Sequence, residues 1–196
     1  KEVLEAHAFT TTVVTDPTRD QLTGALDKFR RDHGGKKKAR LMLYYAGHGH
    51  SINDEMIGET GYIVPVDAPL PQQDLDGFLD VAVDMEEIKS LSKRLRSQHA
   101  YFVFDSCFAG TIFRSRAATV PGHISDMVAS PVRQFQTAGD ANEVVPDVSI
   151  FRRYFVRGLK GAADVDRDGY ILGTEIDSYL KRYVIGDTNG LQHPRG

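Results

Sequence analysis

The sequence has few of the features that mark secreted, membrane-bound or nucleic-acid-binding proteins. It contains a single cysteine, which excludes an internal disulfide framework and is typical of a reducing compartment. Its first residues lack a signal-peptide pattern, and no apolar run approaches the roughly 18 residues that a spanning helix needs. The 24 basic and 27 acidic residues nearly balance, so no net positive field favours nucleic acid. We therefore expect a cytoplasmic protein that binds neither membranes nor nucleic acid.

The 196 residues that are present suit one α/β domain with a hydrophobic core of ordinary size. A content of 41% hydrophobic and 26% charged residues is that of a soluble globular protein. The only basic run, residues 36–40, lacks the spacing of a phosphate-binding loop. We interpret this run as a solvated turn that precedes a strand.

Strand-like and helix-like segments alternate through the first half of the chain, which predicts a largely parallel sheet flanked by helices. Short apolar or β-rich runs predict strands at residues 9–15, 41–45, 62–64, 100–104 and 132–137. Apolar residues at helical spacing predict four helices. The first is capped by Asp16, has Pro17 at its first position and ends near Gly34, and the second runs from a cap at Asp84 to about residue 95. The other two cover residues 150–159 and 174–183. Residues 110–131 have no periodicity, so we expect an exposed loop there.

Two residues with complementary chemistry follow the ends of two predicted strands. Cys107 comes just after residues 100–104, and His48, with glycine on both sides, follows 41–45. The carboxyl ends of strands face the functional crevice of an open α/β sheet, so these residues can meet although 59 positions separate them (107 minus 48). A thiolate can attack a carbonyl while an imidazole protonates the departing amine. The pair therefore predicts covalent acyl transfer, with a small buried and inert cysteine as the alternative.

The motifs YYAGHG at 44–49 and FDSCFAG at 104–110 resemble those of caspases, and more specifically of metacaspases and their bacterial relatives. The later VRQFQTAGD, SIFRRYF and acidic turn extend this resemblance over nearly the whole chain. It implies an α/β, caspase-like three-layer fold in a single domain of residues 1–196. Within this domain it implies a large-subunit-like part (1–110), a linker (111–131) and a small-subunit-like part (132–196).

The resemblance also implies a cysteine endopeptidase that acts on protein or peptide substrates and requires no cofactor. It assigns His48 as the catalytic histidine, because the family places glycine directly after this residue, and it leaves His50 as a loop residue. The backbone N–H groups of Gly49 and Cys107 would hold the oxyanion, and no separate acid orients the imidazole. A catalytically inactive relative that serves as a scaffold is the alternative. Further domains or a regulatory partner are expected in the full-length protein.

Asp105 is the residue that we expect to set specificity. Caspases that cut after aspartate carry glutamine two residues before the cysteine, whereas metacaspases carry a carboxylate there. A carboxylate in the primary pocket pairs with Arg or Lys and repels Asp, so the resemblance predicts cleavage after basic P1 residues. Alternatively, Asp105 only hydrogen-bonds the turn after its strand. Ala46 replaces a serine that many metacaspases have in this pocket, which removes one polar contact.

Two further expectations concern regions outside these motifs. Family members begin with a core strand and a loop that carries another pocket acid, and neither has a counterpart in this sequence. Because a parallel sheet without that strand exposes a hydrophobic edge, we expect a segment upstream of Lys1. Arg114 and Arg116 lie where family members are often cut, so self-cleavage is expected there, with an ordinary surface loop as the alternative.

One acidic segment fits the twelve-residue calcium-loop pattern D-x-D-x-D-G-x5-E, which surrounds a cation with oxygens and turns sharply at glycine. The residues that match are Asp164, Asp166, Asp168, Gly169 and Glu175. Calcium is therefore a candidate ligand, and a calcium-responsive regulatory module is an alternative function. The competing interpretation is an acidic turn that caps the last helix. Asp67 matches an aspartate near the calcium site of some metacaspases, but the rest of that site has no counterpart here.

Overall fold

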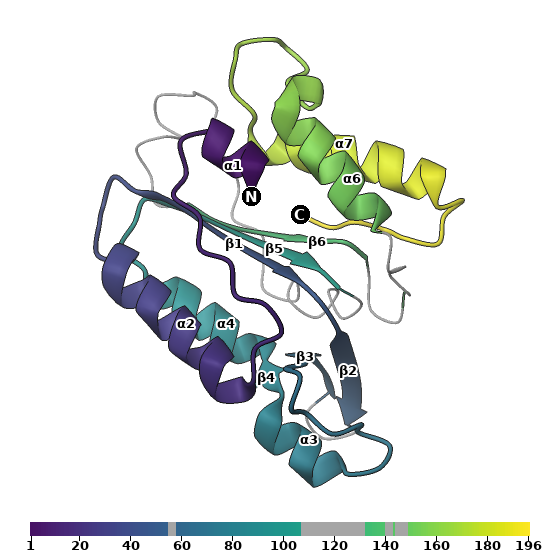
Figure 1. The fold of residues 1–196 in the computed structure, drawn as a ribbon. Coiled ribbons are helices and arrows are strands. Elements are labelled where there is room, and N and C mark those ends of the chain that lie inside the picture. Colours follow the sequence, from purple (N-terminus) through teal and green to yellow (C-terminus); the bar gives the residue numbers. More distant parts are fainter. Residues whose placement is uncertain (55–57, 107–131, 140–142, 144–148) are drawn as a thin grey trace.

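The computed structural model describes residues 1–54, 58–106, 132–139, 143 and 149–196 (Figure 1). The predicted linker, with Arg114 and Arg116, lies outside the described residues. In the described part, helices cover both faces of a parallel sheet, which confirms the predicted α/β caspase-like architecture.

Two three-stranded sheets are described, and they meet at the C-terminal end of β1. The central sheet has the order β1-β5-β6, and both of its pairings are parallel. Its strands are β1 (Arg40–Ala46), β5 (His99–Asp105) and β6 (Val132–Thr137). The second sheet is antiparallel and consists of β2 (Gly49–Asp54), β3 (Gly58–Ile63) and β4 (Val83–Asp84).

The helices divide between the two faces of the central sheet, with α2 and α4 on one face and α6 and α7 on the other (Figure 1). Their bounds are α1 (Glu2–Ala6), α2 (Arg19–His33), α3 (Leu75–Val81), α4 (Met85–Arg94), α6 (Ile150–Arg157), the π-helical turn η2 (Gly158–Ala162) and α7 (Gly173–Asp187). No helix among these described segments is long and apolar enough to cross a bilayer.

The core has two halves that share strand β5. Phe102 and Phe104 point into the half under α2 and α4, where Phe102 stacks on Phe135 of β6 with ring centroids 4.9 Å apart. Val103 points the other way and packs with Phe155 of α6. Because both faces of β5 are covered, its sequence is a continuous apolar run rather than an alternating one. This packing fixes the strand whose end carries Asp105.

Most of the predicted elements are confirmed. Each of the runs 41–45, 62–64, 100–104 and 132–137 falls mainly or wholly within a strand. Helix α2 ends at the C-cap Gly34, and α4 begins after Asp84, whose carboxylate accepts a hydrogen bond from the Glu86 N–H. These boundaries follow from local capping chemistry, which a sequence displays directly.

Two predictions in the N-terminal region are wrong. Residues 9–15 are not a strand, because none of the described strands pairs with them. The first long helix does not start at Asp16, which has a positive φ of 45°. It starts after Thr18, whose hydroxyl accepts from the Gln21 N–H while the Gln21 side chain accepts from the Thr18 N–H. This reciprocal capping box satisfies two backbone donors at once and outweighs the cap predicted at Asp16.

Candidate active site

The ends of β1 and β5 lie side by side and in register. The last residue pair between the two parallel strands joins Ala46 to Asp105. Paired strands are about 4.8 Å apart, so the residues that follow these two ends leave the sheet at one shared edge. Ala46, Tyr44 and Asp105 point to the same face, because side chains alternate along a strand and Tyr44 packs toward α6.

The backbone at His48 is held in place from two sides. Its carbonyl oxygen accepts hydrogen bonds from the Tyr45 hydroxyl, at 2.6 Å, and from the Val64 N–H, at 3.1 Å. Burial raises the pKa of Tyr45 to about 12, so this hydroxyl remains a neutral donor at physiological pH. A side chain at Gly47 would place its Cβ 2.7 Å from the Tyr45 hydroxyl oxygen, so the glycine is required for this contact. The His48 side chain itself is exposed.

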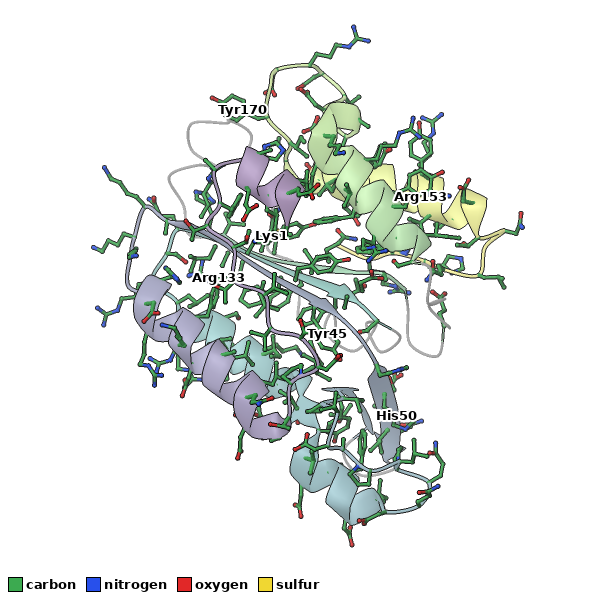
Figure 2. All side chains as sticks on the ribbon, viewed as in Figure 1. Lys1, Tyr45, His50, Arg133, Arg153 and Tyr170 are labelled. Carbon is green, nitrogen blue, oxygen red and sulfur yellow. The ribbon has the colours of Figure 1, made fainter. Side chains whose placement is uncertain are left out.

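His50 differs from His48 in its surroundings. The sequence predicted a loop at His50, but this residue lies in β2, opposite Tyr62 of β3 (Figure 2). Its ring packs edge-on against the fully buried Phe78 of α3, with centroids 5.5 Å apart. His50 therefore has a packing role in the antiparallel sheet, whereas His48 stands between the two sheets with an exposed imidazole.

Asp105 is the buried acid at this edge of the sheet, with 5% of its surface exposed. One carboxylate oxygen accepts a hydrogen bond from the Tyr44 hydroxyl at 2.9 Å, and the other accepts one from the Ser149 hydroxyl at 2.8 Å. Ser149 is the N-cap of α6, and its oxygen also accepts from the Arg152 N–H at 2.8 Å. One serine thus joins the start of α6 to the end of β5.

Burial raises the pKa of the Asp105 carboxyl, and this effect is only partly offset by the hydrogen bonds from Ser149 and Tyr44 and by the charge of Arg152. The pKa of Tyr44 is also raised, first by its burial and then by the negative charge of Asp105. Tyr44 therefore stays protonated and donates. The site holds a carboxylate whose desolvation is not fully compensated by the described protein groups.

The caspase-domain model of the peptidase C14 family matches residues 1–168. The chain belongs to the caspase domain family. This membership supports a cysteine peptidase-type function and confirms the broader resemblance inferred from the motifs. Comparison with curated proteins found no match.

In this caspase domain, the structure brings together some of the predicted site residues. Ala46, His48 and Asp105 lie at the C-terminal edge of the sheet, and Gly49 opens β2 opposite Ile63. Cys107 lies outside the described residues, immediately after the described Ser106.

Sequence reasoning missed three residues of this site: Tyr44, Tyr45 and Ser149. Tyr44 could have been found from strand periodicity, because it is two positions before Ala46 and so shares its face. Ser149 directly precedes an apolar helical stripe, which is a typical N-cap signal. The contact of Ser149 with Asp105 spans 44 residues, however, and no local pattern indicates it.

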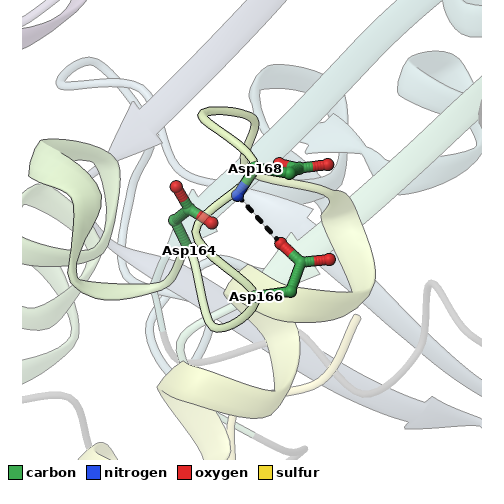
Figure 3. A group of neighbouring side chains, drawn as sticks. All are labelled: Asp164, Asp166 and Asp168. Atoms are coloured by element: carbon green, nitrogen blue, oxygen red, sulfur yellow. Dashed lines mark hydrogen bonds between the residues drawn. The ribbon is translucent and has the colours of Figure 1, made fainter.

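The acidic turn of the caspase domain lies between η2 and α7, away from these strand ends. Asp164, Asp166 and Asp168 each offer an oxygen within 4.8 Å of the others (Figure 3). The dashed line in Figure 3 is the hydrogen bond from the Asp168 N–H to the Asp166 carboxylate, at 3.2 Å. One oxygen of Asp164 is buried and has no hydrogen-bond partner among the described residues, so the turn has an unused ligand atom.

Glu175 is not among these three clustered acids. Its carboxylate accepts hydrogen bonds from the N–H groups of Val165, at 3.2 Å, and Leu172, at 2.8 Å, and so ties the turn to the start of α7. Asp67, the other residue considered for calcium, is exposed and accepts from the Arg19 N–H in the first turn of α2. The contacts of Glu175 are those of the helix-capping interpretation.

Proposed function

We propose that this caspase domain is a cysteine endopeptidase that cleaves after Arg or Lys, with Cys107 as the nucleophile and His48 as its proton-transfer partner. The observation that carries the proposal is the register pair Ala46–Asp105. His48 follows the first of these residues by two positions, and Cys107 follows the second by two. Two motifs that are far apart in the sequence therefore start from neighbouring strand ends.

The proposed reaction is acyl transfer in two steps. The Cys107 thiolate attacks the scissile carbonyl, and the N–H groups of Gly49 and Cys107 donate to the resulting oxyanion. The C–N bond breaks as the His48 imidazolium protonates the departing amine, which leaves a thioester. His48 then takes a proton from water, whose oxygen attacks the thioester and releases the acid. The two hydrogen bonds that hold the His48 carbonyl support this role, because catalysis of this kind depends on a fixed backbone.

The proposed P1 pocket is built around Asp105. Each of its oxygens accepts one hydroxyl hydrogen bond and retains a lone pair, so a guanidinium or ammonium group can still bind. Ala46, which pairs with Asp105 across the two strands, adds only a small and exposed side chain to this edge. A cationic P1 side chain would supply the positive charge that the two neutral hydroxyls do not.

The pKa of Asp105 favours this interpretation over a purely structural role. A carboxylate retained as a turn cap gains stability from its partners, and its pKa usually falls below the ordinary value. At Asp105, burial has the larger effect and raises the pKa. The charged form of such a desolvated acid would be stabilised by a cationic ligand, because a nearby positive charge lowers its pKa.

The direct test is hydrolysis of three fluorogenic peptides that differ only in P1, which is arginine, glutamine or aspartate. We expect turnover of the arginine peptide and little or none of the aspartate peptide, because like charges repel in the pocket. Turnover of the aspartate peptide alone would contradict the assigned specificity. Absence of turnover for all three, with and without calcium, would favour the inactive scaffold.

Replacing Ser149 with alanine tests the contact between α6 and the pocket. Removal of this hydroxyl removes a hydrogen bond that lowers the pKa of Asp105, so the pKa should rise further. At a given acidic pH less Asp105 is then ionised, and the acid limb of arginine-peptide cleavage should move to higher pH. The lost cap should also lower the free energy of unfolding by about 1 kcal/mol.

Ser178 provides the matched control for this change, because its hydroxyl donates to the Thr174 carbonyl on the exposed side of α7, away from Asp105. The Ser178→Ala variant should keep the wild-type pH profile. If Ser149→Ala keeps it as well, while thermal unfolding shows the lost cap, Ser149 does not position Asp105.

We also propose that the acidic turn binds calcium, on the strength of the unpartnered Asp164 oxygen and the three clustered carboxylates. Terbium can take the place of calcium at such a site. Tyr170, two positions after Asp168, can transfer excitation to it, so bound terbium luminesces. Asp166→Asn together with Asp168→Asn should abolish terbium luminescence that calcium displaces. The control is the double variant Asp76→Asn with Asp80→Asn, which removes the same negative charge from two exposed positions of α3. Equal loss in both variants, or no luminescence in the wild type, would refute the site.

A further inference from the structure

Four arginines surround a hollow at the end of the central sheet that is opposite Asp105. The hollow has a volume of about 400 Å³, and its lining is Arg30, Arg31, Gly34, Gly35, Arg94 and Arg96. The first two arginines lie in the last turns of α2, and the other two lie at the end of α4 and just after it. Strands β1 and β5 start a few residues further on, so this arginine hollow is at their N-terminal ends.

The backbone locks the two helix ends together beneath the hollow. The N–H of Arg96 donates to the carbonyl of Gly34 at 2.6 Å. A Cβ at Gly34 would lie 2.8 Å from the side chain of Leu95 and 2.5 Å from the Arg30 carbonyl oxygen, so only glycine permits this close approach. The arginines therefore project from backbone segments that are already held together, and a ligand has to order only their side chains.

Positive charge in the arginine hollow exceeds the negative charge around it. Asp27 pairs with Arg30 at 3.4 Å and with Arg31 at 4.0 Å, so one carboxylate serves two guanidinium groups. In the part of the chain that the structure describes, no acid pairs with Arg94 or Arg96. Residues 36–38, three exposed lysines, follow directly after Gly35. The concentration is notable in a chain of net charge −3.

Hydrogen bonding of the helix-end carbonyls does not account for Arg94 and Arg96. Cations are favourable at helix C-termini because they satisfy and oppose the negative ends of the last carbonyls. At α4 this role belongs to Arg133 of β6 (Figure 2). Its guanidinium donates to the carbonyls of Ser92 at 3.1 Å and Leu95 at 2.6 Å. The two exposed arginines are thus left available to a ligand.

We propose that the arginine hollow binds a small polyphosphate anion. Guanidinium groups bind phosphoryl oxygens through paired, charge-assisted hydrogen bonds, and two arginines from each helix end can hold more than one phosphoryl group. The lining has no aromatic side chain on which a base could stack, so recognition is confined to the phosphates. The site is separate from the proposed peptidase site and does not depend on it.

Isothermal titration of the full chain with sodium tripolyphosphate tests this proposal. Arg94→Gln with Arg96→Gln should weaken binding by at least about tenfold, because two charge-assisted contacts are lost. Arg157→Gln with Arg182→Gln is the matched control, since it removes the same charge from exposed positions of α6 and α7. This control should bind as the wild type does. Thermal unfolding of both variants checks that each remains folded.

Two outcomes would overturn the proposal: no measurable binding of tripolyphosphate by the wild type, or equal weakening in the two variants, which would indicate a general charge effect. ATP provides a second arm. If ATP binds no more tightly than tripolyphosphate, recognition of phosphate alone is supported. If ATP binds much more tightly, the base makes contacts and the phosphate-only site is wrong.

Discussion

Replacing Cys107 with alanine should lower kcat/KM for an arginine peptide on the order of 10⁴-fold or more, because no other side chain can form the thioester. The chain has no second cysteine that could take over. We expect the variant to fold and to bind the peptide, since only a sulfur atom is removed. Initial rates measured at substrate concentrations well below KM give the comparison.

The two histidines provide an internal control for the same claim. His48→Ala should lose nearly as much activity as Cys107→Ala, because the two residues act as a unit. His50→Ala should keep most of its activity and lose stability instead, since its ring packs on Phe78. The reverse pattern, with activity lost only at His50, would show that the wrong histidine was assigned.

Asp105→Asn should have the next largest effect after the loss of Cys107 or His48, lowering kcat/KM for arginine peptides by about 10²-fold or more. The amide keeps the shape of the carboxylate and can still bond Tyr44 and Ser149, but it cannot neutralise a guanidinium. A peptide with glutamine at P1 should lose far less. Rates for the two peptides, measured side by side, separate a change of specificity from general damage.

The same variant also distinguishes a binding acid from a structural one. The pKa of Asp105 is raised in the folded protein, so its charged form costs stability, and this cost appears as the pH rises through the folded pKa. Asp105→Asn should therefore melt at the same or a higher temperature than the wild type at neutral pH, and the difference should shrink in acid. Marked destabilisation at neutral pH, with unchanged specificity, would make Asp105 a structural cap.

The sequence sufficed for those parts of the fold that depend on local chemistry. Continuous apolar runs predicted β1 and β5 correctly, because a strand covered on both faces has no polar side. Asp84 and Gly34 marked helix ends, because caps satisfy backbone groups within a few residues. The positions of His48 and Asp105 at neighbouring strand ends followed from the same strands.

Features that depend on distant partners could not be predicted. The β2-β3-β4 sheet needs a pairing of β3 with β4, which lie on either side of α3. The pairing of β2 with β3 is not marked by a distinct hairpin signal in the sequence. Residues 9–15 have a strand-like composition, yet a strand forms only where a partner offers backbone groups. The pocket contacts of Asp105 likewise come from Tyr44 and Ser149, which only the folded chain brings together.

The central claim is that Cys107 forms a covalent bond with the carbonyl carbon of a substrate that has a basic P1 residue. The most direct measurement is the intact mass of the protein after incubation with a peptidyl chloromethyl ketone that has arginine at P1, whose methylene carbon alkylates an active-site thiolate as chloride leaves. We expect one adduct per chain, mapped to Cys107 by fragmentation. Formation of this adduct should be strongly slowed in His48→Ala and should not occur with the aspartate analogue. An unmodified Cys107, or equal labelling by both analogues, would contradict the account.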